Sequence, residues 1–416
     1  MRIAVIGAGI SGMTVAYLLH RDHQITVFEA NDYIGGHTHT VDVPASGKTY
    51  AVDTGFIVFN ERTYPHFVHL LQRLGVPWQK SNMSFSVYCE RTELEYSPSS
   101  LDHFFAQRRN LLRPGFWRMV REIFAFRRHL PQTAELPVTV TLGDYLRGEG
   151  YSPMFREYFI IPMGAAIWSA DPRRFEEMPA CMFARFFANH GFLNVRDQPQ
   201  WLVVQGGSRE YAKVLAAPFR DRIRLICPVQ SIRRMPDSVE VEAADGRPER
   251  FDHVIIATHS DQALGLLADP TEKEREILGA IPYQENQVVL HTDQSVLPRR
   301  RKVWASWNYR IPRETRDGVS MTYDMNILQG LDADPEFCVT LNPTERINPE
   351  KVLRRMAYSH PVYNPQALAA QRRHAEISGV HRTHYCGAYW ANGFHEDGVN
   401  SALTVCGYFG KGLSDA

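Results

Sequence analysis

The chain has 416 residues, and its 46 lysines and arginines are balanced by 46 aspartates and glutamates, which gives a formal net charge of zero. This balance excludes a nucleic-acid-binding protein that depends on an overall basic charge. An apolar content of 44% with 22% charged residues excludes a disordered or fibrous chain. The length predicts two or three domains, at roughly 100–200 residues per domain.

The cysteines stand far apart in the sequence and form no CxxC pair. Isolated cysteines argue against a zinc ribbon or a dithiol centre and are typical of a reducing compartment. No signal-peptide cleavage site follows the N-terminus, and the most apolar later stretch, 158–168, is shorter than the roughly 20 residues of a membrane-spanning helix. We therefore expect a cytoplasmic protein that at most rests on the inner face of a membrane.

A glycine-rich turn follows the first predicted element, a buried parallel strand over 3–6, and precedes a predicted helix over 13–20. The turn reads Gly7-Ala8-Gly9-Ile10-Ser11-Gly12. The first glycine permits a tight turn, the second lets a pyrophosphate approach the backbone, and the third allows the helix to pack closely on the strand. Because the start of the helix also offers free N–H groups to phosphates, the turn predicts a dinucleotide site.

An acidic residue closes the second predicted strand, 24–28. Glu29 is placed to accept hydrogen bonds from the ribose hydroxyls of a dinucleotide, and its charge would repel a 2′-phosphate. Together with the glycine-rich turn, Glu29 predicts binding of FAD or NAD and disfavours NADP.

A second glycine motif, Gly35-Gly36-His37, follows Glu29-Ala30 and favours FAD. At this motif the chain resembles the flavoprotein oxidoreductases of the amine oxidase superfamily, which includes phytoene desaturases and protoporphyrinogen oxidase. In these proteins an arginine usually completes the motif, and its backbone and side chain contact the FAD. The resemblance implies that His37, with a neutral or titrating imidazole, takes the place of that arginine.

Later segments carry the same resemblance: the glycine pair 206–207 with a helix over 210–217, the strands 223–232 and 238–242, the strand 251–258, and the C-terminal motif 385–402. In the last motif, the resemblance implies a helix that starts near Asp397–Gly398 and points its N–H groups at the N1/O2 edge of the flavin. Ala388 stands where relatives have an acid. Because no second GxGxxG occurs, we expect the substrate itself to reduce the flavin.

The implied fold is α/β, with a discontinuous Rossmann-like FAD-binding domain of the amine-oxidase type from residues 1–75, 197–285 and 376–416. An α+β substrate domain, built on a mixed or antiparallel sheet plus helices, would come from 76–196 and 286–375. The implied FAD-binding residues are Gly7, Gly9, Ile10, Ser11, Gly12, Glu29, Ala30, Gly35, Gly36, His37, Val229, Ala257, Gly387, Asp397, Gly398, Val399 and Ser401.

Candidate catalytic residues are few, because the flavin carries the redox chemistry. In amine-oxidising relatives a lysine near flavin N5 comes from the strand after the second FAD segment, but the matching stretch here, 284–293, contains no lysine. Lys302 lies beyond this stretch, and we expect it in a solvated loop. The remaining candidates are Tyr389, Trp390, His395 and Asn308, for which structural packing is the alternative role.

Two histidine pairs, His66-x-x-His69 and His37-x-His39, have spacings seen in metal sites. Neither pair has a cysteine nearby or a third ligand in register. We therefore expect no metal.

One segment departs from the neutral average, because residues 103–130 hold seven arginines and a single acid, Glu122. Its apolar residues recur at helical spacing, with arginines on the other face. One interpretation is a helix that lies on an anionic membrane with its apolar face down. The alternative, which we favour, is an amphipathic helix that covers the substrate domain. The apolar positions are Phe116, Met119, Val120, Ile123, Phe124 and Leu130, and the arginines are Arg118, Arg121 and Arg128.

The leading functional prediction is an FAD-dependent oxidoreductase that removes a hydride and a proton from an organic substrate. The chain is most similar to bacterial flavoproteins associated with cyclopropane and methylated fatty acid synthesis, a likeness carried by 290–293, 304–309, 340–343 and 387–398. It implies desaturation of a fatty-acyl or lipid chain. The alternatives are an amine or amino-acid oxidase, or a non-enzymatic binding protein of the Rab GDP-dissociation-inhibitor kind. We expect a small-molecule or lipid partner and no nucleic acid.

Overall fold

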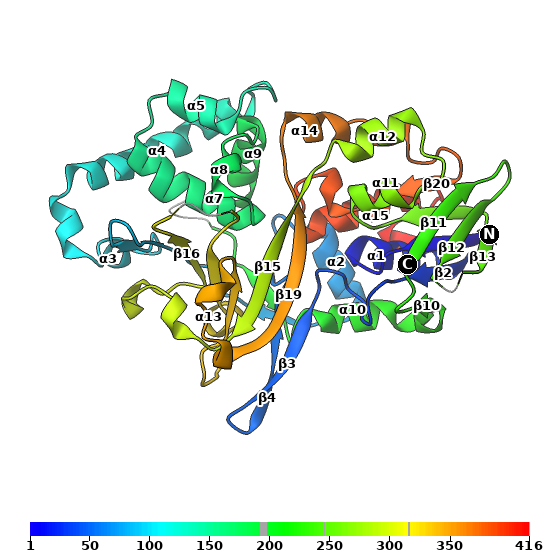
Figure 1. The fold of residues 1–416 in the computed structure, drawn as a ribbon, viewed down its shortest axis with the longest axis horizontal. Helices are drawn as coiled ribbons and strands as arrows, with labels where there is room; N and C mark the ends of the chain where they lie inside the picture. Colours follow the sequence, from blue (N-terminus) through cyan, green and yellow to red (C-terminus); the bar gives the residue numbers. More distant parts are fainter. Residues whose placement is uncertain (192–197, 245, 315–316, 416) are drawn as a thin grey trace.

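The computed structural model describes residues 1–191, 198–244, 246–314 and 317–415. A parallel sheet of five strands, in the order β10-β2-β1-β14-β20, forms one end of the molecule (Figure 1). Its strands, which come from distant parts of the chain, are β1 (Arg2–Ile6), β2 (Gln24–Phe28), β10 (Ile223–Arg224), β14 (His253–Ile256) and β20 (Thr383–Tyr385).

Both faces of this sheet are buried, as the continuous apolar run of β1 predicts. Ile3 and Val5 point into a core shared with four helices, whereas Ala4 and Ile6 point into a second core on the opposite face. The first core is completed by α1 (Ile10–Leu19), α2 (Pro65–Leu74), α10 (Arg209–Ala216) and α15 (His395–Gly407). The second is completed by α11 (Ser260–Leu266), α12 (Glu272–Gly279) and an antiparallel sheet of β11 (Val229–Arg234), β12 (Val239–Ala243) and β13 (Pro248–Phe251).

A mixed sheet of seven strands forms the other half of the molecule, in the order β19-β15-β18-β17-β16-β7-β8. Only β16 and β7 pair in parallel among these neighbours. The strands are β7 (Phe85–Cys89), β8 (Leu94–Tyr96), β15 (Tyr283–His291), β16 (Trp307–Ile311), β17 (Met321–Asp324), β18 (Cys338–Leu341) and β19 (Val352–Pro361). The expected α/β fold with a second, mixed-sheet part is thereby confirmed.

A helical lobe packs beside this sheet and contributes most of the largest hydrophobic core (Figure 1). Its helices are α3 (Leu101–Phe104), α4 (Pro114–Ala134), α5 (Leu142–Gly148), α6 (Pro153–Phe155), α7 (Ile161–Trp168), α8 (Pro172–Phe175) and α9 (Ala180–His190). Smaller elements join the two halves: α13 (Met325–Gln329), α14 (Pro365–Gln371), the hairpin of β3 (Thr40–Ala45) and β4 (Lys48–Asp53), and the sheet of β5 (Val58–Phe59), β9 (Leu202–Val204) and β6 (Trp78–Lys80).

The prediction of a single strand over 223–232 is wrong, because this stretch forms two separate strands. The chain breaks at Ile226, which has a φ of +51°, so that β10 joins the parallel sheet and β11 joins the separate antiparallel sheet. The expected domain boundary at 285 falls inside β15, which begins at Tyr283. The boundary at 196–197 lies outside the described residues.

The apolar face of α4 covers the core of the helical lobe, as the favoured interpretation of this segment expects. Phe116, Met119 and Leu130 are buried against this core. Phe124 was expected on the same face, but this is wrong: its side chain is 49% exposed, because position 124 falls on the same helical stripe as the exposed Trp117. In the described part of the chain, none of the helices combines the length and the apolar composition needed to cross a bilayer.

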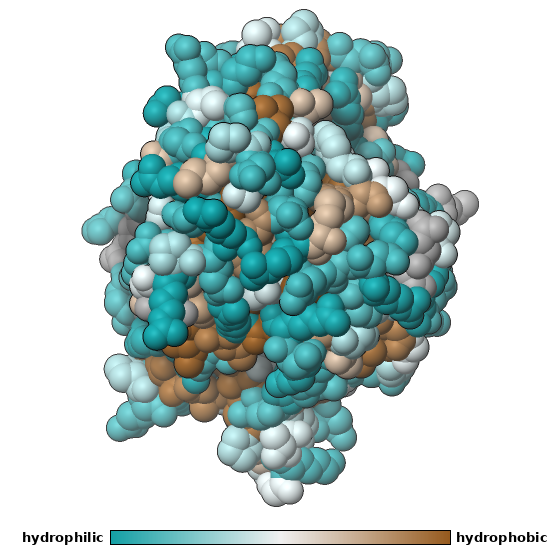
Figure 2. Space-filling view, turned by 90° about the vertical axis from the view of Figure 1, so that its right-hand side faces the viewer, coloured by the Kyte–Doolittle hydropathy of each residue, from teal (hydrophilic) through white to brown (hydrophobic). Residues whose placement is uncertain are grey.

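The surface over the five-stranded parallel sheet is largely polar. Figure 2 shows this end of the molecule: hydrophilic side chains cover most of it, and apolar areas are limited and gather toward its lower part.

Candidate functional site

The glycine-rich turn adopts the geometry that phosphate binding requires. Gly7 has a φ of +100°, and its N–H donates to the carbonyl of Phe28 at 2.8 Å. A Cβ on Gly12 would lie 2.0 Å from the Gly7 carbonyl oxygen, so that only glycine allows this approach of helix to strand. Helix α1 then begins at Ile10; its N-cap residue, Gly9, supplies no side-chain cap, and its first turn contains no acid. Its first N–H groups are therefore free to bind an anion.

The carboxylate of Glu29 is held beside this turn. It accepts hydrogen bonds from the N–H of Ala8 at 2.8 Å and from the N–H of Asn31 at 2.9 Å. Oε1 also accepts from the side-chain amide of Asn31 at 3.0 Å, whereas Oε2, which accepts from Ala8, can accept a further hydrogen bond from a ribose hydroxyl. Ala30, the next residue, is exposed. The N–H of Cys227 donates to the carbonyl of Glu29 at 2.8 Å and places the start of β11, at Val229, nearby.

The second glycine motif lies directly against the first. The N–H of Gly35 donates to the carbonyl of Ala8 at 2.8 Å, and a Cβ on Gly36 would lie 3.2 Å from the Cα of Gly9. Ala257, at the end of β14, closes the other side, because its carbonyl oxygen lies 3.0 Å from a Cβ built on Gly7. Three of the predicted segments thus surround the start of α1.

His37 is partly buried and lies between two other partly buried histidines. Its ring stacks on His259, with ring centres 5.7 Å apart, and on His360, with ring centres 5.5 Å apart. Burial, reinforced by His259, lowers the pKa of His37 to about 4. At neutral pH the chain therefore offers a neutral imidazole at the end of the second glycine motif.

The C-terminal motif meets the N-terminal one through α15. The hydroxyl of Ser11 donates to the carbonyl of Gly398 at 3.0 Å, and a Cβ on Gly398 would lie 2.7 Å from Cγ2 of Ile10. The N–H of Gly387 donates to the hydroxyl of Ser401 at 2.9 Å, next to the fully buried Val399. The first turns of α1 and α15 therefore lie together, so that two helix N-termini can face one cofactor.

Helix α15 begins at His395, two residues earlier than expected. Asp397, at the third position, accepts hydrogen bonds from the N–H groups of Asn392 and Phe394 at 3.2 and 2.9 Å. Burial raises the pKa of Asp397 to about 7. The carboxyl group thus orders the turn that leads into the helix.

Comparison with known proteins decides the family. Residues 10–321 match the model of the family described as flavin containing amine oxidoreductase. The chain belongs to this family. The family confirms FAD as the expected cofactor. The chain is 25% identical over 321 residues to AofH of Mycobacterium tuberculosis, which carries the name of a flavin-containing monoamine oxidase. This match covers 74% of the chain and only 64% of AofH.

A shorter match and two solved structures extend the comparison. The chain is 29% identical to a 1-hydroxycarotenoid 3,4-desaturase of Flavobacterium sp. over 110 residues, which are 24% of this chain and 20% of the desaturase. Putrescine oxidase bound to putrescine has a TM-score of 0.70 at 15% identity, over 98% of this chain and 99% of that one. A fatty acid isomerase from P. acnes that produces CLA has a TM-score of 0.72 at 15% identity, over 98% of both chains. The two structures establish the amine-oxidase-type fold.

The residues at the turn fit the FAD of this family. A Cβ on Gly9 would meet no atom within 4 Å, so that space for a cofactor borders the uncapped start of α1. Near the start of α15, the buried hydroxyl of Tyr363 has no hydrogen-bond partner among the described residues, and it lies 2.7 Å from a Cβ built on Gly393. Open space at one end and an orphaned hydroxyl at the other are what a bound dinucleotide and its substrate would fill.

The four candidate catalytic residues occupy different surroundings. Tyr389 and Trp390 directly follow Gly387, and Tyr389 is buried. The side chains of Tyr389 and Trp390 interact with each other, but neither Tyr389 Oη nor Trp390 Nε1 has another hydrogen-bond partner in the described chain. These two residues therefore stay candidates for the flavin-facing wall.

His395 is held in place by its neighbours. Its Nε2 lies 3.0 Å from the hydroxyl of Thr38 and 2.9 Å from that of Tyr211, and its ring stacks on Phe56 with ring centres 3.4 Å apart. Burial lowers the pKa of His395 well below its ordinary value. These contacts join α15 to the second glycine motif and to α10, so that they position the helix.

Asn308 uses its whole side-chain amide inside the seven-stranded sheet. Its Oδ1 accepts from the hydroxyl of Ser86 and the N–H of Ala305, and its Nδ2 donates to the carbonyls of Ala305 and Thr322. No donor or acceptor position remains for a substrate. We leave Asn308 out of the proposed chemistry.

Strand β15 carries a neutral amide at its buried centre instead of a lysine. Asn286 is fully buried; its Nδ2 donates to the carbonyl of Ser169 at 3.0 Å and lies 3.1 Å from Nδ1 of His360, while its Oδ1 accepts from the side chain of Asn342 at 2.8 Å. Lys302 lies at the surface and pairs with Asp102. Neither Asn286 nor His360 was singled out by sequence reasoning, because a buried amide and a lone histidine carry no local motif.

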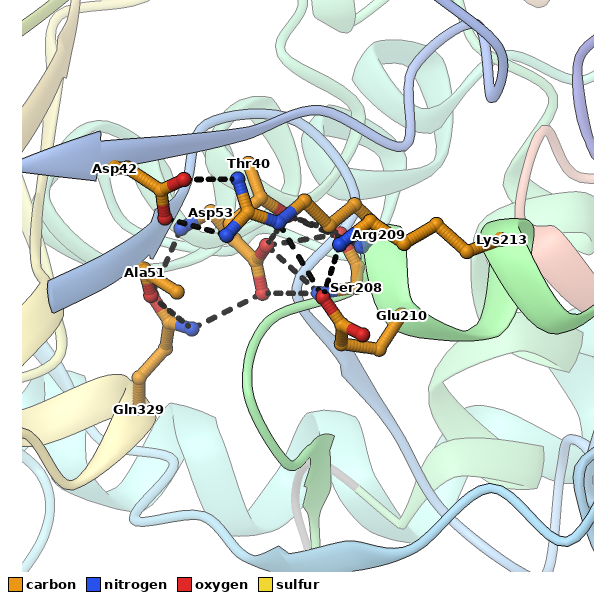
Figure 3. A network of polar contacts seen from close by, with 9 residues as sticks. All are labelled: Thr40, Asp42, Ala51, Asp53, Ser208, Arg209, Glu210, Lys213 and Gln329. Atoms are coloured by element: carbon orange, nitrogen blue, oxygen red, sulfur yellow. Dashed lines mark hydrogen bonds and ion pairs between the residues drawn. The ribbon is translucent and has the colours of Figure 1, made fainter.

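A buried aspartate joins the two halves of the molecule near the site. Asp53, at the end of β4, accepts hydrogen bonds from Thr40 Oγ1, from the N–H and hydroxyl of Ser208, and from the side chain of Gln329 (Figure 3). Gln329 also accepts from the backbone N–H of Asp53 at 2.9 Å. Asp53 thereby ties the hairpin, the start of α10 and α13 together.

Replacement of Asp53 by asparagine is expected to destabilise the protein by about 2 kcal/mol. In the asparagine variant, one of the four groups that donate to the carboxylate would face the amide NH2. The side-chain amide of Gln329 cannot flip to accept from this NH2 without losing the hydrogen bond it accepts from the backbone N–H of Asp53. Urea unfolding at pH 7 measures this change. Asp42→Asn is the matched control: Asp42 binds Arg209 in the same network but is half exposed, so its loss should cost less than about 1 kcal/mol. Equal losses would contradict the prediction.

Proposed function

We propose that the protein is an FAD-dependent oxidoreductase that acts on an uncharged, apolar substrate, the hydrocarbon chain of a lipid. The observation that carries the proposal is a contiguous cluster of uncharged polar side chains at the junction of the two halves, in which His37 stacks on His259 and His360, and Asn286 Nδ2 lies 3.1 Å from Nδ1 of His360. Burial lowers the pKa of His37 and His259 to about 4 and that of His360 to about 3, and Asn286 is a neutral amide. A buried charged substrate would need an opposite charge, whereas a hydrocarbon would not.

The surroundings of the C-terminal motif also favour an apolar substrate. Phe394, which precedes α15, stacks on Phe186 of α9 with ring centres 4.9 Å apart. Tyr363 lines a small cavity together with Trp168 and Met178, and Asp171, Arg174 and Gln284 contribute to the same lining. The aromatic part of these surroundings can hold hydrocarbon by burial of apolar surface.

The bound FAD would supply the acceptor for a hydride. The protein would orient the substrate and exclude water, and its tyrosines would stay protonated because burial raises the pKa of Tyr363 and Tyr389 well above the ordinary value. Protonated hydroxyls donate hydrogen bonds and do not remove protons. Tyr363 and Tyr389 are therefore assigned to orienting the substrate.

Anaerobic mixing of the FAD-loaded protein with candidate substrates tests the proposal. Fatty acids or phospholipids should bleach the flavin absorption, whereas putrescine and benzylamine should not. Bleaching by amines alone would overturn the lipid substrate. A protein that binds no FAD after reconstitution would overturn the enzyme itself and favour a binding protein on the same fold.

Amine oxidation is the second candidate, favoured by the match to AofH over 74% of the chain and by the fold shared with putrescine oxidase. An amine in contact with these neutral histidines and Asn286 would have to enter as its free base. Bleaching by amines should then rise with pH through the pKa of the amine, and bleaching by lipids would be absent.

Tyr363→Phe should stabilise the apo-protein and slow the reduction of flavin by substrate. The buried Tyr363 hydroxyl has no partner in the described part of the apo-protein, so its removal should raise the free energy of unfolding by about 1 kcal/mol. Reduction should slow because the substrate loses an orienting contact. The two readouts are urea unfolding and stopped-flow flavin reduction. Loss of stability together with unchanged reduction would contradict this role.

A further inference from the structure

Large apolar side chains are exposed at the tip of the helical lobe. Leu112 is 88% exposed, and Trp117 and Phe124 are 44% and 49% exposed. We call this surface the α4 tip and define it by Leu111, Leu112, Trp117 and Phe124 with Arg109, Arg113, Arg121 and Arg128. Figure 1 places α3 and the start of α4 at the left end of the molecule, opposite the five-stranded parallel sheet and the two termini.

The exposed residues of α4 form one stripe along the helix. Trp117, Arg121, Phe124 and Arg128 follow the i, i+4, i+7, i+11 spacing and therefore share a face. The residues of α4 that pack into the core lie on another face of the helix. The fold therefore does not require the exposed rings of Trp117 and Phe124. The indole N–H of Trp117 donates to the carbonyl of Leu111 at 2.9 Å and fixes the two exposed segments to each other.

The α4 tip carries uncompensated positive charge. Across the described residues, Arg109, Arg113, Arg121 and Arg128 take part in no ion pair. The nearby acids are already neutralised, because Asp102 binds Arg108 and Lys302, and Glu122 binds Arg118 at 2.9 Å. Exposed apolar side chains and free arginines thus occupy the same surface.

We propose that the α4 tip docks the protein on the surface of an anionic phospholipid bilayer. Leu112, Trp117 and Phe124 would enter the boundary between head groups and acyl chains, and Arg121 and Arg128 would contact lipid phosphates. Charge complementarity supports this partner, and a tryptophan beside arginines is suited to the interface, where one part of the surface is apolar and the other is wet. The inference holds whichever substrate the enzyme takes.

Vesicle flotation with the FAD-loaded protein tests the proposal. The protein should float with vesicles that contain 30% phosphatidylglycerol and remain in solution with phosphatidylcholine vesicles. Binding should weaken as the salt concentration rises, because the attraction between exposed charges is screened. Equal binding to both kinds of vesicle, or no binding to either, would overturn the proposal.

Two variants assign the binding to the α4 tip. Replacement of Arg121 and Arg128 by glutamine should lower the partition into anionic vesicles about 25-fold, at about fivefold for each arginine near the surface. Leu112→Ser with Phe124→Ser should lower it at least as far, whereas Ile226→Ser, an exposed apolar residue on the other half, should leave it unchanged. Circular dichroism melting shows that each variant is folded.

Loss of flotation in the Ile226 control to the same extent would overturn the assignment. A second copy of the chain is the competing occupant. If the wild-type protein dimerises in solution and the serine variant is monomeric with unchanged flotation, the tip is a dimer contact and the membrane proposal is wrong.

Discussion

Gly9→Ala is expected to leave the apo-protein as stable as the wild type but to weaken FAD binding by about 10- to 100-fold. Position 9 has a φ of −73°, which alanine adopts freely, and an added Cβ meets no protein atom within 4 Å. The methyl group would instead occupy the space next to the uncapped start of α1, where the diphosphate has to approach. An added methyl in a well-packed contact costs about 1–3 kcal/mol.

Gly12→Ala is expected to fail differently, although it belongs to the same motif. Its Cβ would lie 2.0 Å from the Gly7 carbonyl oxygen, so the strand and helix must separate, at a cost of about 3 kcal/mol to folding. Urea unfolding of the apo-proteins and FAD titration by fluorescence separate the two effects. Gly265→Ala, a helix position with no atom near the added Cβ, is the control and should be neutral or slightly stabilising. If Gly9→Ala bound FAD as the wild type does, the phosphate site would lie elsewhere.

The parts of the site that sequence predicts are those set by local backbone chemistry. Gly7, Gly9 and Gly12 lie within one turn, and Glu29 closes the next strand, so that spacing along the chain is enough to place them together. Ser11 and Gly398, which are far apart in the chain, were expected at one cofactor only through a resemblance at the C-terminal motif, and their direct contact was not predicted.

The residues that sequence reasoning missed depend on long-range packing. His259 and His360 stack on His37 because β14, β19 and the second glycine motif converge, and none of these positions has a distinguishing neighbour in the sequence. Asp53 likewise ends an ordinary strand, and only the fold brings α10 and Gln329 to its carboxylate. The exposure of Phe124 was missed for a related reason: hydrophobicity shows that a helix is amphipathic, but its packing decides which apolar residues stay outside.

The apo-protein is expected to lose stability steeply as the pH falls from about 6.5 to 4. Burial lowers the pKa of six histidines to about 4 or, for His360, to about 3 in the folded state, against about 6.5 in an unfolded chain. The other five are His37, His190, His259, His291 and His384. The unfolded chain therefore binds more protons over this range, and each histidine removes up to about 3 kcal/mol as the pH falls.

Three acids with raised pKa values act in the opposite direction. Burial raises the pKa of Asp53 to about 6, that of Asp397 to about 7 and that of Asp324 to about 8. The folded state holds their protons more tightly, so the stability they contribute is greatest at low pH and is lost as the pH rises through those values. Because the histidines outnumber these acids, acid should still destabilise the protein, and the acids should set the maximum stability near pH 6.5–7.

Urea unfolding of the apo-protein at intervals from pH 4.5 to 8.5 measures this balance. His360→Gln should flatten the acid limb by about one proton, because the glutamine has no proton to gain. His381→Gln, at an exposed position, should leave the slope unchanged. A stability that stayed constant from pH 7 to 5 would show that these histidines already carry protons in the folded protein. The interpretation of the junction as a cluster of neutral side chains would then be wrong, and the argument for an uncharged substrate would fail with it.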